Sequence, residues 1–84
     1  MKKHLTLEIT QKDIDDGIPR DLRRCPVALA GCRMFPRKRV IAGAFSLKVT
    51  NTICYTYPYE LEEFVWNLDI GNAVQPGVFE LTLK

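Results

Sequence analysis

The sequence predicts a single α+β domain over residues 1–84, with an antiparallel-rich sheet and two main helices packed on one side of it. Segments near both ends alternate apolar and polar residues, which is typical of half-buried strands. Two internal runs instead combine helix-start signals with a helical spacing of apolar residues. No linker, repeat or low-complexity segment separates these elements. Their order reads as βαββαβ, for which a ferredoxin-like arrangement is one possible topology.

Residues 4–10 are predicted to form the first strand, because polar and apolar side chains alternate strictly along them. A helix start follows directly. Thr10 can cap this helix, and Asp13 stands three residues later as a carboxylate version of the capping box. Gly17 and Pro19 close the helix after a short run. The first part of the chain is therefore expected to be a strand and a short helix.

The least polar stretch of the chain is residues 25–35, which predicts a helix near the centre of the fold. Pro26 suits the first helical position, with Cys25 as the cap. The helix should end near Met34, just before Pro36. Nearly every position around the helical wheel is apolar or small, so we expect this helix to be covered on most sides.

Residues 37–57 are rich in the β-branched and aromatic residues that favour strands. The run is too long for one strand of ordinary length. A bend near Phe45-Ser46 and a turn at Thr50-Asn51 divide it. The three predicted strands are residues 39–44, 47–50 and 52–57.

The second main helix is predicted over residues 58–70. Pro58 suits its first turn, and the glutamates that follow are favoured by the positive end of the helix dipole. Gly71 can adopt the left-handed conformation that ends the helix. A Pro76-Gly77 turn and the alternating residues 79–84 then predict a C-terminal strand. The helix stripe that is expected to face the core consists of Leu61, Phe64, Val65 and Leu68.

The opposite face of this second helix is also apolar. On a helical wheel, Trp66 lies about 140° from Leu61, and Tyr59 and Ile70 lie about 160° and 180° from it. A surface helix is normally polar there, and a large exposed apolar patch usually marks an interaction site. Either a partner protein, a second copy of the chain or another element of the same chain would cover this face. The candidate partner-binding residues are Tyr59, Glu63, Trp66 and Ile70.

The strongest electrostatic feature is the basic window Arg20–Arg39. It holds seven positive charges and one negative charge, whereas the formal net charge of the whole chain is +2. Such a window could bind phosphates or an acidic protein face, as one patch or as two groups separated by the central helix. Phe45, Tyr55 and Tyr57 could add stacking platforms for bases, or they could belong to the core. The candidate anion-binding residues are Arg20, Arg23, Arg24, Arg37, Lys38 and Arg39.

The sequence contains no pattern that is typical of an enzyme or a metal site. His4 is its only histidine, and it has no phosphate-binding loop or nucleophile turn. The spacing of Cys25 and Cys32 is unlike the close ligand pairs of zinc sites. At a helix N-terminus beside arginines, Cys25 could form a reactive thiolate, although a buried cap is the favoured interpretation. We therefore predict no catalytic residues, no metal and no cofactor.

An odd number of cysteines without disulfide-type spacing indicates a reducing compartment. The first residues lack the unbroken apolar core of a signal peptide. No run approaches the roughly 20 apolar residues that span a bilayer. We therefore expect a cytoplasmic protein that does not act at a membrane.

Several motifs occur along the chain in an order that resembles one known family. They are Ile9-Thr10, Asp13-Ile14 and Gly17, then Cys25-Pro26-Val27-Ala28-Leu29-Ala30, then Phe64-Val65, Leu68-Asp69 and Gly71, and finally Val74, Pro76 and Phe79-Glu80-Leu81. On these residues the chain resembles a family of small accessory proteins of tailed bacteriophages and prophages, which carries no established activity. Gly77, where an aromatic residue is expected, and the loosely comparable segment before Tyr57 depart from the family pattern.

The resemblance implies a non-structural accessory protein that acts in the cytoplasm of an infected bacterium. Small phage accessory proteins often bind host components, including defence systems such as CRISPR complexes. By that analogy, the sequence favours a non-catalytic protein that blocks or modulates a bacterial host partner. The alternative is a nucleic-acid- or nucleotide-binding module that uses the basic window. A homodimer formed through the Trp66 face also stays open.

Overall fold

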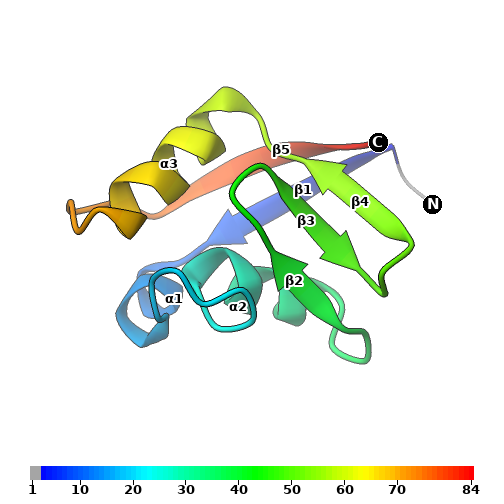
Figure 1. Cartoon of the computed structure of the whole chain (residues 1–84), viewed down its shortest axis with the longest axis horizontal. Coiled ribbons are helices and arrows are strands. Elements are labelled where there is room, and N and C mark those ends of the chain that lie inside the picture. The colour runs from blue at the N-terminus through cyan, green and yellow to red at the C-terminus, as the bar shows by residue number, and fades with distance from the viewer. Residues whose placement is uncertain (1–2) are drawn as a thin grey trace.

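Figure 1 shows the computed structural model, which describes residues 3–84 as one curled sheet of five strands with three helices. This is the α+β architecture that the sequence predicts. In chain order the elements are β1 (His4–Ile9), α1 (Gln11–Asp16), α2 (Pro26–Met34), β2 (Val40–Ala42), β3 (Ser46–Val49), β4 (Ile53–Thr56), α3 (Tyr59–Asp69) and β5 (Gly77–Leu83).

The strands lie in the order β1-β5-β4-β3-β2, and every neighbouring pair is antiparallel. The first and last strands therefore pair, with Leu7 opposite Phe79. The ferredoxin-like topology is not formed. That topology needs a split βαβ unit, whereas α3 continues beyond the end of β4 and the chain then returns as β5, antiparallel to β4 (Figure 1).

One face of the sheet forms the core, because inward and outward side chains alternate along each strand. The strand residues on this face include Leu5, Leu7 and Ile9 of β1, Leu47 and Val49 of β3, and Leu81 of β5. Both main helices pack on this same face, as predicted, and the α2 and α3 residues buried there include Val27, Ala28, Ala30, Leu61, Phe64 and Leu68.

Close packing of α2 depends on its small residues. Gly31 is buried, and a Cβ atom added to it would lie 2.8 Å from Cγ1 of Val40, closer than real contacts allow. The glycine therefore lets α2 approach β2. Gly71 has a φ of 88° after the end of α3, which confirms the predicted left-handed termination.

The predicted turn at Thr50-Asn51 is also confirmed. Both residues have positive φ, 58° and 70°, which is the geometry of a tight hairpin connection. The strand boundaries differ more. The predicted strand 39–44 shortens to β2, whereas β5 begins at Gly77, where the sequence predicts a turn. Pairing of Gly77 with Ile9 explains the earlier start, because β1 is long enough to extend the ladder.

A buried carboxylate ties the first strand to both N-terminal helices. Thr10 and Asp13 form the predicted capping box at α1, with hydrogen bonds of 2.9 and 3.2 Å. Asp13 also accepts two hydrogen bonds from the Arg33 guanidinium of α2, at 2.7 and 2.9 Å. The same guanidinium donates to the carbonyl oxygen of Glu8 in β1 at 2.7 Å. This cluster fixes how α1 and α2 sit against the sheet edge.

Burial alone would raise the pKa of Asp13, but hydrogen bonds from Arg33 and from the Thr10 backbone outweigh it, and the pKa is lowered overall. The folded-state pKa therefore lies below the unfolded value, which is about 3.9. The ionised Asp13 stabilises the fold above the unfolded pKa. That contribution is lost as the pH falls through the folded-state pKa.

We predict that Asp13→Asn lowers the free energy of unfolding by about 1–3 kcal/mol at pH 7, because the Arg33 pair is broken while its guanidinium stays only half exposed. Urea unfolding should show this difference shrinking as the pH falls below about 4. The matched control is Asp16→Asn, which removes the exposed Lys12–Asp16 pair and should change stability by less than about 0.5 kcal/mol. Equal losses in the two variants would contradict this account.

Candidate functional site

The face of α3 opposite the core is exposed and carries the aromatic residues that the sequence places there. Leu61 and Phe64 point into the core, whereas Tyr59 is 71% and Trp66 66% exposed. Ile70, at the end of the helix, is also an exposed apolar residue. Trp66 follows Tyr59 after about two helical turns, and Ile70 follows Trp66 after about one, so the three side chains lie on one stripe.

Phe45, from the loop between β2 and β3, joins this stripe. Its side chain is 68% exposed. With Tyr59, Glu62, Glu63 and Trp66 it lines a shallow hollow of about 290 Å³. We call these five residues the aromatic patch. The sequence identified Tyr59, Glu63 and Trp66 as partner-binding residues. It named Phe45 only as a possible stacking platform and did not place Phe45 or Glu62 in this site, since nothing local connects a residue before β3 with α3. Ile70 lies one turn beyond Trp66, outside the hollow.

Tyr57 positions the loop that carries Phe45. Its backbone N–H donates to the carbonyl oxygen of Phe45 at 3.0 Å. Its hydroxyl donates to the carbonyl oxygen of Gly43 at 2.9 Å. Burial raises the pKa of Tyr57 far above its ordinary value, so the phenol stays protonated and keeps donating. Tyr57, two residues before the start of α3, thus holds both ends of the loop.

In the part of the chain that the structure describes, the glutamate carboxylates of α3 have neither an ion pair nor a hydrogen bond. The ion pairs within residues 3–84 are Lys12–Asp16 and Arg33–Asp13. The side chains of Glu60, Glu62 and Glu63 therefore leave their charge uncompensated beside the aromatic patch. Close to the first turn of α3 the helix dipole favours them. An unpaired negative rim opposes the approach of phosphate groups and favours a cationic partner.

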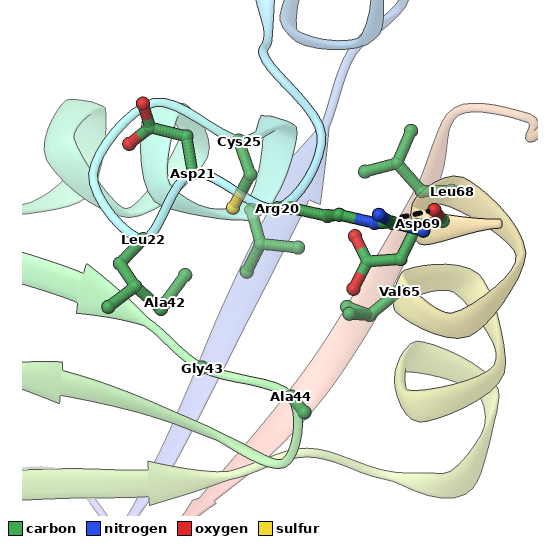
Figure 2. Close-up of a pocket in the computed structure, with 11 residues that line it drawn as sticks. Arg20, Asp21, Leu22, Cys25, Ala42, Gly43, Ala44, Val65, Leu68 and Asp69 are labelled. Atoms are coloured by element: carbon green, nitrogen blue, oxygen red, sulfur yellow. Dashed lines mark hydrogen bonds between the residues drawn. The ribbon is translucent and has the colours of Figure 1, made fainter. Parts of the chain in front are cut away.

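Figure 2 shows a second hollow, a pocket of about 200 Å³ between the 20–25 segment, the 42–44 segment and the C-terminal half of α3. Its lining is mostly apolar, with Leu22, Val65 and Leu68 among the walls. The Arg20 side chain runs along the pocket, and its Nε donates to the carbonyl oxygen of Asp69 at 2.9 Å. Sequence analysis did not identify this pocket, because three distant segments form it.

Along the chain, the predicted anion-binding residues lie on both sides of α2. Arg20 is held against the end of α3. Arg23 and Arg24 precede α2, and the other basic residues, Arg37, Lys38 and Arg39, follow it. The nine residues of α2 span about 13 Å between the two groups. The basic window is therefore divided into two groups.

The predicted stacking platforms are mostly absent from the surface. Tyr55 and Tyr57 are buried in the core, so these two tyrosines are not exposed for stacking on bases. Both lie on the covered face of the sheet, where the strand alternation turns them inward. Phe45 alone of the three is exposed.

Cys25 is the buried cap of α2, as the sequence analysis favours. Its sulfur accepts a hydrogen bond from the backbone N–H of Ala28 at 3.4 Å. Burial raises the pKa of the Cys25 thiol, which keeps it protonated at neutral pH and opposes a reactive thiolate. Among residues 3–84, no group of three or more His, Cys, Asp or Glu side chains is arranged to hold a metal ion. The same part of the chain contains no helix long and apolar enough to cross a membrane.

Comparison of the chain with protein-family models, curated proteins and solved structures gives no match. The resemblance to phage accessory proteins therefore stays a prediction from the sequence. The candidate site rests on its geometry alone, which is an exposed aromatic patch beside unpaired carboxylates.

We predict that Tyr57→Phe lowers the free energy of unfolding by about 1–2 kcal/mol, because the carbonyl oxygen of Gly43 loses its donor. NMR relaxation should show greater motion of residues 43–45. The matched control is Tyr59→Phe, which removes an exposed hydroxyl and should change stability by less than about 0.5 kcal/mol. A Tyr57→Phe variant as stable and as ordered in this loop as the wild type would show that the hydroxyl does not position the site.

Proposed function

We propose that this chain is a non-catalytic binding protein that docks a partner protein on the aromatic patch. The observation that supports the proposal is the convergence of Phe45, Tyr59 and Trp66 on one hollow, each about two-thirds or more exposed. Exposed clusters of this kind usually mark interaction sites. Tyrosine and tryptophan are also enriched among the residues that dominate binding energy.

The family resemblance supplies the biological setting of the proposal. A phage accessory protein in the bacterial cytoplasm would use the patch to block or modulate a host protein or protein complex, with a defence system of the CRISPR type as one such target. Occupying a surface that the host protein needs would be sufficient. Neither a cofactor nor a catalytic residue is required for this mode of action.

The alternative function, binding of a nucleic acid or nucleotide, has less support. Tyr55 and Tyr57 are buried, and the arginines fall into two groups at opposite ends of α2. Continuous phosphate tracking with aromatic stacking needs both features on one surface. The carboxylates of the aromatic patch also oppose phosphate.

We predict that Tyr59→Ala combined with Trp66→Ala weakens binding of the host partner by about thirtyfold or more, because truncating such anchor residues costs about 2 kcal/mol or more. Wild-type and variant chains would be compared as baits in lysate of a bacterial host, with quantitative mass spectrometry of the captured proteins. Affinity for each captured protein would then be measured with purified components at two salt concentrations.

The matched control is Val78→Ala, which truncates an apolar side chain of similar exposure on the open face of the sheet. It should retain every partner. Binding through the aromatic patch should also depend little on salt, whereas phosphate binding by arginines would weaken steeply. A correctly folded double variant that keeps all its partners and its oligomeric state would refute the proposal.

A further inference from the structure

The pocket of Figure 2 and the aromatic patch share one seam, where the 42–45 segment lies beside α3. Ala44 lines the pocket, and the next residue, Phe45, lines the hollow of the patch. On the helix, Val65 lines the pocket and the next residue, Trp66, lines the hollow. A ligand that lies across the patch therefore reaches the mouth of the pocket without leaving the surface.

The pocket has the size and walls of a receptor for one apolar side chain. Its volume is about 200 Å³. A cavity of about 150 Å³ with apolar walls is large enough to hold benzene. Leu22, Val27 and Leu68 provide apolar walls, and Ala42 and Gly43 leave the space open because their side chains are small or absent. A leucine or phenylalanine side chain matches this space.

The charged residues that line the pocket are two carboxylates, Asp21 and Asp69, and one cation, Arg20, and this excess of negative charge favours a further cation next to that apolar side chain. Within residues 3–84, the Asp69 carboxylate has neither an ion pair nor a hydrogen bond, whereas its carbonyl oxygen already holds Arg20. Asp21 is engaged, because its carboxylate accepts the backbone N–H groups of Arg23 and Arg24 at 2.9 and 3.1 Å. Asp69 is therefore the carboxylate at the mouth that is left for a cation of the partner, beside the Arg20 guanidinium.

We infer that the partner docks through a basic, apolar segment, which inserts one apolar side chain into the pocket and sets an arginine or lysine against Asp69. The inference rests on the proposed function and specifies the chemistry of the partner. The same segment continues over Trp66, where Glu62 and Glu63 supply further negative charge. Complementary charge fixes its register, and the apolar side chain anchors it.

A second copy of the chain is a poorer occupant. Its basic segments precede and follow α2, and Arg20 and Leu22 already form walls of its own pocket. Contact between one copy's basic segment and the next copy's seam would be head-to-tail. Such contacts build rings or open chains rather than a closed pair. We therefore assign the seam to a different protein.

The experiment selects binders of the full-length chain from a displayed library of random short peptides. The selected peptides should be enriched in leucine or phenylalanine within a few residues of arginine or lysine. Asp69→Arg should weaken their binding about tenfold or more, because like charges then meet at the pocket mouth. Ala44→Phe, which fills the pocket from an exposed position, should weaken it to a similar extent.

The matched control is Glu60→Arg, which makes the same change of charge on the same helix but lines neither hollow. It should weaken binding less than about threefold. Circular dichroism would establish that all variants keep the fold. Equal losses in Glu60→Arg and Asp69→Arg would overturn the inference, as would enrichment of acidic peptides or of none.

The outcomes also separate this inference from the proposed function. Peptides that depend on Trp66 but tolerate Asp69→Arg and Ala44→Phe would refute the pocket anchor and leave the aromatic patch as the docking surface. Peptides that tolerate changes at all three positions would refute both. The chain could also self-associate as its concentration rises. If the selected peptides do not displace this self-association but Asp69→Arg abolishes it, the seam belongs to a second copy and the inference is overturned.

Discussion

The packing of α3 against the sheet is the constraint on which the candidate site depends. Leu61 is fully buried, and Phe64 meets Phe79 of β5 edge to face with ring centroids 5.7 Å apart. Because each residue turns the helix by about 100°, burying this stripe directs Tyr59 and Trp66 to solvent. Full burial of such large side chains would stabilise a domain by roughly 1.5–3 kcal/mol each. The chain leaves both side chains exposed and so lacks this stabilisation, although a domain this small buries little surface. Such a loss is expected where the exposed surface binds a partner.

The surroundings of α3 are fixed at both ends before any partner arrives. At its N-terminal end, Tyr57 holds the loop that carries Phe45 through two hydrogen bonds. At its C-terminal end, Arg20 joins the 20–25 segment to the carbonyl oxygen of Asp69. Arg20 has a φ of 68°, an unusual backbone conformation for a residue other than glycine. Preorganised surfaces lose less conformational entropy on binding, so this arrangement suits a docking surface.

Local patterns in the sequence predicted the elements and the apolar side of α3, because both follow from the periodicity of neighbouring residues. The capping box of Thr10 and Asp13 could be predicted for the same reason. The ion-pair partner of Asp13 could not be predicted, since Arg33 belongs to a different helix. Likewise, the inward direction of Tyr55 and Tyr57 depends on which face of the sheet is covered. Phe45 and the pocket depend on contacts between segments far apart in the chain, and the pairing of β1 with β5 replaced a ferredoxin-like order for that reason too.

Trp66 is the only tryptophan of the chain, so its fluorescence reports on the aromatic patch alone. The most direct measurement is acrylamide quenching of this fluorescence in the free protein, over a range of protein concentrations, and again with a bound partner. The account predicts that the indole is readily quenched in the free monomer and becomes protected when the partner binds. An indole already protected in the free monomer, or quenched equally with the partner bound, would contradict the claim that this face of α3 is a docking surface.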